Sequence, residues 1–159
     1  MKKNLILLLA SFLMLLGAKA ERLPVNATHG GVLVENKAVV GAFPIVTETE
    51  TSPLFVSPTE ATVVKKAAAM FVDDVERVTK KKPSLSFSKK VSGKRIIVFG
   101  TLGNSPFIDK LVKQGKLNAK AIANGWEQYL VQVVKNPAKG IDEALVVAGS
   151  DKRGTAYGI

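Results

Sequence analysis

Residues 94–100 read KRIIVFG, and this short stretch decides the fold class. Four consecutive residues, from Ile96 to Phe99, are apolar and mostly β-branched, and no polar residue alternates with them. An unbroken apolar run of strand length indicates a strand that is covered on both faces, as in parallel sheets. The stretch therefore predicts an α/β fold with this strand inside it.

A long helix is predicted before this strand, within the stretch SPTEATVVKKAAAMFVDDVERVTKKKP at residues 57–83. Ser57 and Glu60 match a capping box in which Ser57 is the N-cap residue, and Pro58 suits the first helical position. Pro83 and the lysines before it predict the end of the helix. The apolar residues recur at helical spacing and predict one buried stripe: Val64, Ala67, Ala68, Phe71, Val75 and Val78.

Acidic side chains on the same helix raise the alternative of a catalytic carboxylate group. Asp73 and Arg77, and likewise Glu76 and Lys80, are four residues apart and are expected to pair on the outer face. We therefore interpret these carboxylates, together with Asp74, as part of a solvated helix face.

The remaining elements complete a mixed sheet. A short apolar strand at 53–57 is expected to lie parallel to strand 94–100, because a helix links the two. A helix from Ser105-Pro106 to Gly115, a short helical piece at 118–124 and an antiparallel hairpin of strands 126–134 and 143–148 follow. The order β-α-β-α-β-β, followed by the first turn of another helix, predicts a two-layer α/β sandwich.

The first twenty residues have the composition of a cleaved signal peptide. Lys2 and Lys3 precede an apolar run at 5–16, and small residues stand at 18 and 20. The run is shorter than the roughly 20 residues that cross a bilayer, and no cysteine follows it to carry a lipid. We expect residues 1–20 to be removed and residues 21–159 to form one soluble domain, secreted or periplasmic, without a membrane anchor.

The formal net charge is +10, and +7 once residues 1–20 are removed. The basic residues form groups such as 80–82 and 89–90 that contain no aromatic residues for stacking on bases, so a nucleic acid is not an expected partner. Charged helix ends and loops explain these groups, and attraction to an acidic polymer is the alternative.

Neither a cofactor nor a metal ion is expected, and no catalytic residue is assigned. His29 is the only histidine and the chain has no cysteine, so the usual ligands of a zinc site are missing. Residues 100–103, GTLG, follow a strand but lack the order of a phosphate-binding loop.

Trp126 is the only tryptophan, and the chain has two tyrosines. A sugar-stacking surface usually needs several exposed aromatic side chains, so we expect Trp126 to lie in the core or at an interface. A sugar-stacking platform is the alternative.

Three stretches stand out together: Gly100-Thr101-Leu102-Gly103 with Ser105-Pro106, Trp126-Glu127, and AGSDKRGT at 148–155. Through them the sequence resembles, over residues 43–159, the N-terminal domain of glycoside hydrolase family 115, the xylan α-1,2-glucuronidases. The pattern G-x-D-x-R-G-x-x-Y-G at 149–158 also resembles a wider group of exo-acting glycoside hydrolases, in which a small α/β domain precedes a (β/α)8 barrel.

The resemblance implies an inverting hydrolase that removes 4-O-methylglucuronic or glucuronic acid from xylan, with its acid and base in the barrel. The implied partners are the barrel domain of the same parent chain and a plant cell-wall polysaccharide. Lys152 and Arg153 are the candidates for contact with the acidic sugar. The alternative is that Asp151 caps a helix and pairs with Arg153.

The resemblance further implies that Ile159 lies inside a helix that leads into the barrel. We therefore expect a fragment that lacks its catalytic domain and is inactive alone. Two alternatives stay open. One is a stand-alone exported basic module that binds acidic glycans, and the other is a sibling hydrolase family that shares the small domain but cleaves another substrate.

Overall fold

The computed structural model describes residues 39–159, so the predicted signal peptide at 1–20 and His29 lie outside the described residues. Within them the chain forms five strands and three helices in an α/β arrangement. In chain order the elements are β1 (Leu54–Val56), α1 (Thr62–Thr79), β2 (Leu85–Phe87), β3 (Arg95–Thr101), α2 (Pro106–Lys113), β4 (Tyr129–Ala138), β5 (Ile141–Gly149) and α3 (Lys152–Gly158).

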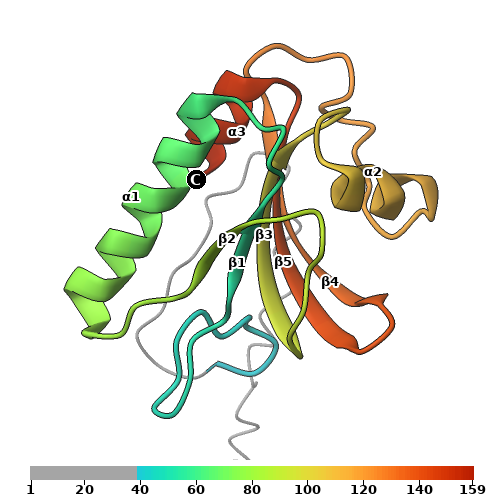
Figure 1. Cartoon of the computed structure of the whole chain (residues 1–159). Helices are drawn as coiled ribbons and strands as arrows, with labels where there is room; N and C mark the ends of the chain where they lie inside the picture. The colour runs from blue at the N-terminus through green and yellow to red at the C-terminus, as the bar shows by residue number, and fades with distance from the viewer. Residues whose placement is uncertain (1–38) are drawn as a thin grey trace, which may run out of the picture.

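The strands form one mixed sheet in the order β2-β1-β3-β5-β4. β1, β2, β3 and β5 run parallel, and β4 pairs antiparallel with β5, as the predicted hairpin requires. The α/β class and the mixed sheet are therefore confirmed. Helices α1 and α3 lie against one face and α2 lies against the other (Figure 1), so the two-layer description is incomplete.

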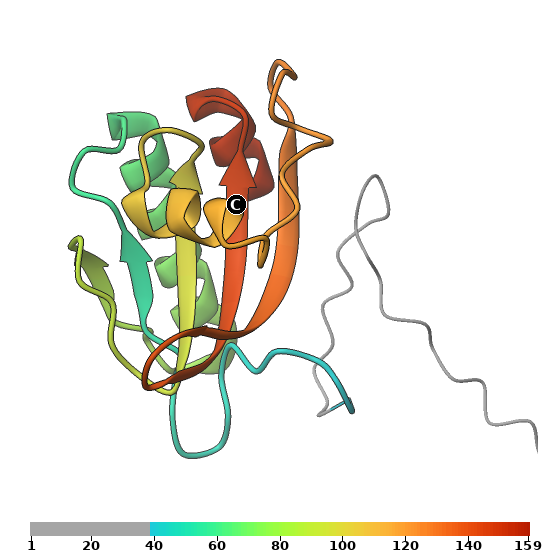
Figure 2. The same cartoon turned by 90° about the vertical axis from the view of Figure 1, so that its right-hand side faces the viewer.

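The stretch that predicted the fold is the centre of the molecule. β3 pairs with β1 on one side and β5 on the other, and Ile96, Ile97, Val98 and Phe99 are at most 2% exposed. Their side chains alternate between two cores: Ile96 and Val98 face the core under α2, and Ile97 and Phe99 face the core under α1 and α3. Figure 2 shows the sheet face on, with α2 in front of it. The absence of polar alternation in the sequence is thus explained by two covered faces.

The predicted capping box is wrong. α1 begins at Thr62 with Ala61 as its N-cap residue, and no side chain caps it. Residues 57–60 form a turn instead, in which the Glu60 N–H donates to the Ser57 carbonyl at 3.1 Å. The Glu60 carboxylate points inward and accepts from the backbone N–H of Thr101 at 2.7 Å, so it is not available to bond back to Ser57.

The rest of α1 follows the prediction, apart from details at its C-terminal end. The helix ends at Thr79, and Lys80 adopts the left-handed conformation with φ 61°. Val78, expected in the buried stripe, is 82% exposed, while Val72 is buried in its place. The acidic side chains lie on the outer face as expected, but their partners differ: Arg77 pairs with Asp74, and Lys82 pairs with Asp73 and Glu76.

Three further elements differ from expectation. The first strand of the hairpin, expected at 126–134, is Tyr129–Ala138, so residues 126–128 precede it. β2 was not predicted, because it has only three residues, lies at the sheet edge and leaves Phe87 48% exposed. Residues 118–124 form turns rather than a helical piece.

No helix within residues 39–159 is both long and apolar enough to cross a bilayer.

Candidate functional site

Buried polar side chains gather where the parallel strands end. Five of them, Ser57, Glu60, Thr101, Ser105 and Thr155, lie on or just after β1, β3 and β5, and each is at most 5% exposed. In open α/β sheets, ligands bind outside the carboxyl ends of the strands. A ligand-binding site is therefore expected at this edge of the sheet.

Glu60 and two threonines form a buried network at this edge. Glu60 Oε1 accepts from the Thr101 N–H at 2.7 Å, and Oε2 accepts from the Thr101 hydroxyl at 3.0 Å. The Thr101 and Thr155 hydroxyl oxygens are 2.8 Å apart, and Thr155 Oγ1 also lies 3.0 Å from the Asp151 carbonyl. The network joins the turn at residues 57–60, which precedes α1, to β3 and α3. Its burial indicates a structural role.

The glycines of the pattern at 149–158 explain how α3 packs. A Cβ at Gly149 would overlap the backbone of Thr155, and one at Gly154 would overlap the carbonyl of Gln128. A Cβ at Gly158 would lie 2.8 Å from the Tyr129 ring. Each glycine therefore permits a close approach between α3 and the strands beneath it, and the pattern is first of all a packing device.

Asp151 caps α3, as the sequence suggested. Its Oδ1 accepts from the N–H groups of Arg153 at 2.8 Å and Gly154 at 2.9 Å. Its Oδ2 accepts from the Glu127 N–H at 2.6 Å, which ties the segment before β4 to the helix. The hydrogen bonds from Gly154 and Glu127 lower the pKa of Asp151 below its ordinary value, because they favour the ionised carboxylate.

Arg153 does not pair with Asp151 as expected, but joins a cluster on the surface. Its Nη1 lies 2.8 Å from Glu127 Oε1, an ion pair whose N–H is not aligned for a hydrogen bond. Nη2 donates to the Tyr157 hydroxyl at 3.4 Å, and the guanidinium lies 5.9 Å from the centre of the Trp126 ring. The Tyr157 hydrogen bond and the Glu127 charge raise the pKa of Arg153. We call Trp126, Glu127, Arg153 and Tyr157 the Trp126 patch.

The exposure of Trp126 contradicts a core position. Its side chain is 76% exposed, so the core alternative of the prediction is wrong, while an interface position stays a prediction. Lys152, the other candidate for contact with an acidic sugar, begins α3 and is exposed. The patch could not be predicted from the sequence, because Trp126 and Glu127 lie 26 to 31 residues before Arg153 and Tyr157, and only the packing of α3 beside β4 brings the two pairs together.

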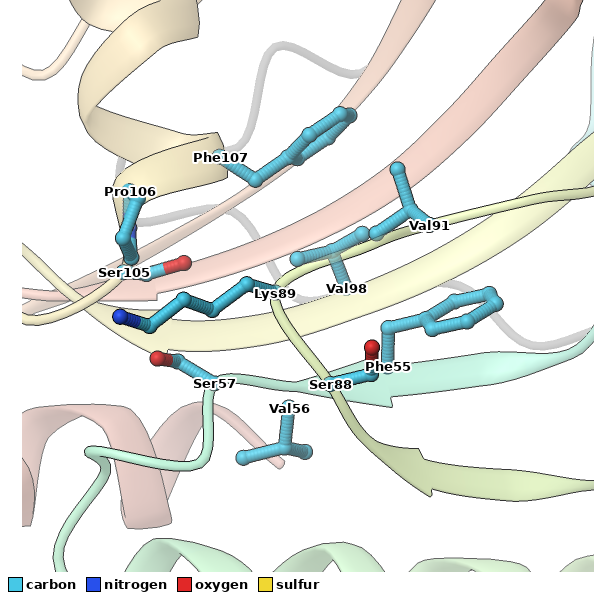
Figure 3. A pocket seen from close by; sticks show the side chains of 10 residues that line it. All are labelled: Phe55, Val56, Ser57, Ser88, Lys89, Val91, Val98, Ser105, Pro106 and Phe107. Carbon is cyan, nitrogen blue, oxygen red and sulfur yellow. The ribbon is translucent and has the colours of Figure 1, made fainter.

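A narrow crevice opens at the same edge, between the ends of β1 and β3. Figure 3 shows its apolar floor, with Phe55 and Val98, and the hydroxyls of Ser57 and Ser105 near the Lys89 side chain. The space amounts to about 10 Å³, which holds about one water molecule. The crevice is thus too small for a sugar ring.

Within residues 39–159, no three His, Cys, Asp or Glu side chains come together as metal ligands.

The fold and the edge site define a small α/β domain with a packed helix and an exposed aromatic patch. No protein-family model matches the chain, and no curated protein matches it. Among solved structures, it is similar to a family GH115 4-O-methyl-α-glucuronidase, BtGH115A, described as having specificity for decorated arabinogalactans. The two share 29% identity with a TM-score of 0.50.

The match covers 67% of this chain and only 12% of the glucuronidase chain. This similarity supports the predicted relation to family 115 glucuronidases and a glucuronidase-related domain. The chain corresponds to a small part of that protein's length, so the activity of the whole does not transfer to it directly.

Proposed function

We propose that this chain is the small α/β domain of an exported polysaccharide hydrolase related to family 115 glucuronidases. In this proposal the parent enzyme removes glucuronic or 4-O-methylglucuronic acid from a plant polysaccharide, and a (β/α)8 barrel outside this chain performs the catalysis. The chain itself has an accessory role and no activity. Residues 1–20 direct export to the periplasm or the medium.

The observation that carries the proposal is the unequal coverage of the match. Two thirds of this chain align with a glucuronidase at 29% identity, but the aligned part is 12% of that enzyme. A domain of this size that recurs in a much longer glycoside hydrolase is best explained as one module of such an enzyme.

The engagement of the described carboxylates supports an accessory role. Inverting glycosidases need two carboxyl groups about 6.5–9.5 Å apart, with room for a water and the sugar between them. Glu60 is buried against Thr101, Asp151 caps α3 and Glu127 pairs with Arg153. Each of these three carboxylates therefore already has a structural partner within the chain.

The polysaccharide is part of the proposal. The sequence resemblance points to xylan, whereas BtGH115A is described by its specificity for decorated arabinogalactans. Lys152 and Arg153 remain the proposed contacts with the acidic sugar. Because Arg153 already faces Glu127, Lys152 has the less compensated charge of the two.

The test is to express the complete reading frame that encodes this chain and to incubate the product with glucuronoxylan and with glucuronidated arabinogalactan. We expect release of the uronic acid from one of them, and none from the 159-residue chain assayed alone. Release by this chain alone would contradict the accessory role. If the complete product released no uronic acid from either polymer, the proposed glucuronidase activity of the parent enzyme would be contradicted.

A second candidate is a separate basic module that binds acidic glycans. The formal net charge of +7 that remains without residues 1–20 favours it. In that case the chain alone should bind glucuronoxylan with an affinity that falls steeply as salt is added, because exposed charges are screened.

A further inference from the structure

The only tryptophan and both tyrosines of the chain are exposed at one end of the molecule. Trp126 is 76% exposed, Tyr157 57% and Tyr129 46%. Arg153 links Trp126 to Tyr157, and Tyr129 lies under Gly158 at the end of the same helix. The premise that the chain has too few aromatic residues for a sugar platform therefore no longer holds, since none of these three is used in the core.

The Trp126 patch is held in place before any ligand arrives. Glu127, next to Trp126, has φ 56°, a conformation that costs a non-glycine residue free energy. The 2.6 Å hydrogen bond from its N–H to Asp151 Oδ2 maintains this conformation. The guanidinium of Arg153 contacts the indole ring. An exposed ring fixed in this way loses little conformational entropy on binding, which is the advantage of a preorganised site.

The charges of the patch are balanced. Arg153 faces the Glu127 carboxylate at 2.8 Å and the Tyr157 hydroxyl at 3.4 Å. A guanidinium with a carboxylate partner gains less from an added anion, so within the Trp126 patch an acidic group adds little, and Lys152 outside the patch is the stronger of the two proposed contacts with an acidic sugar. The patch offers instead an aromatic face surrounded by hydrogen-bonding groups.

We propose that the Trp126 patch binds neutral pyranose rings of a polysaccharide backbone. The partly negative face of an indole attracts the C–H groups that line one side of a pyranose ring. The side chains of Arg153, Glu127 and Tyr157 then exchange hydrogen bonds with ring hydroxyls. This deepens the proposed function, on which the choice of a polysaccharide rests, by adding recognition of the neutral backbone at the Trp126 patch to the proposed contact with the acidic side group beside it.

The single tryptophan makes the test direct, because all indole fluorescence comes from the patch. The 159-residue chain is titrated with xylohexaose, with a neutral galactan oligosaccharide and with glucuronoxylan. We expect a saturable change in Trp126 emission with at least one neutral oligosaccharide, and an affinity that is unchanged between about 50 and 500 mM salt.

Variants are compared by retardation in gels that contain the polysaccharide, which needs no fluorescence. Trp126→Ala should weaken binding by roughly tenfold or more, since it removes the stacking surface. Phe87→Ala is the matched control: it removes an exposed aromatic ring from β2, at the opposite edge of the sheet, and should leave binding unchanged.

Three results would overturn the proposal. They are no response to either neutral oligosaccharide, binding of the acidic polymer alone with strong salt dependence, and equal retardation of Trp126→Ala and the parent chain. The first would instead favour Trp126 as a contact between protein domains. None of them bears on uronic acid release by the complete product, so failure here is distinct from failure of the proposed function.

Discussion

Replacing Glu60 should destabilise the chain far more than removal of a surface helix cap. Glu60→Ala deletes the acceptor of the Thr101 N–H, and Thr101 is only 4% exposed, so this donor has little access to solvent. An orphaned buried donor costs about 1–3 kcal/mol. The Thr101 hydroxyl can turn to Thr155 Oγ1, 2.8 Å away, and is not orphaned. The lost side-chain packing adds roughly 0.8 kcal/mol, because one buried methylene group, Cγ, disappears.

The expected total for Glu60→Ala is therefore about 3 kcal/mol in the free energy of unfolding. Glu60→Gln keeps an oxygen for the Thr101 N–H, and its amide N–H can donate to the Thr101 hydroxyl, so its cost should stay within about 1 kcal/mol. Urea unfolding followed by circular dichroism measures both. With an m-value near 2 kcal/mol/M, the alanine variant should shift the midpoint by about 1.5 M.

Glu48→Ala is the matched control for this series. Glu48 is exposed in the loop before β1, so its removal should change stability by less than about 0.5 kcal/mol. A loss below about 1 kcal/mol for Glu60→Ala would equal that of an ordinary cap and would refute the buried network. Equal losses for the alanine and glutamine variants would show that the charge of Glu60, not its hydrogen bonds, supports the fold.

Three more predictions follow from the packing of α3 and the sheet. Gly154→Ala forces a methyl group against the Gln128 carbonyl and should cost about 2–3 kcal/mol in urea unfolding; a neutral result would mean that α3 can shift away. Ile97→Ala should cost about 2–5 kcal/mol, because it leaves a cavity in the core under α1; a loss under 1 kcal/mol would speak against that packing. Because the pKa of Asp151 is lowered by folding, its contribution to stability is complete above its ordinary value of 3.8 and disappears as the pH falls through the lower folded value. The difference in urea midpoint between the parent chain and Asp151→Asn should thus be constant above about pH 5 and shrink towards pH 3, whereas a constant difference throughout would contradict the shift.

The elements that could be predicted are those in which local pattern and burial agree. The apolar run of β3, most of the stripe of α1 together with its C-terminal stop, and the antiparallel hairpin of β4 and β5 each have one physical explanation, and the structure confirms them. β2 could not be predicted, because three half-exposed residues at a sheet edge leave almost no pattern. The prediction of a capping box was wrong for a different reason. The Glu60 carboxylate accepts a hydrogen bond from the backbone N–H of Thr101, which is distant in sequence, instead of from the backbone of Ser57.

The candidate site was only half visible in the sequence. The role of Asp151 as N-cap residue could be predicted, because the first N–H groups of a helix need an acceptor and an aspartate just before the helix supplies one. The pairing of Arg153 with Glu127 and Trp126 could not, because it depends on how closely α3 approaches the segment before β4. That approach is set by Gly154 and Gly158, whose role is visible only when the neighbouring backbone is in place.

The position of β3 has a consequence for how the chain acquires its structure. Both strands that pair with β3 are more than forty residues away in sequence, one before it and one after it. The sheet centre can therefore form only after two large loops close, an entropic cost that local helix formation does not offset. We expect slow, millisecond-to-second folding, and during synthesis the apolar β3 stays unpaired on one side until β5 has left the ribosome. A nascent chain halted between the two strands exposes an apolar, β-branched segment with an unpaired edge, which makes this interval a point at which a chaperone would be needed.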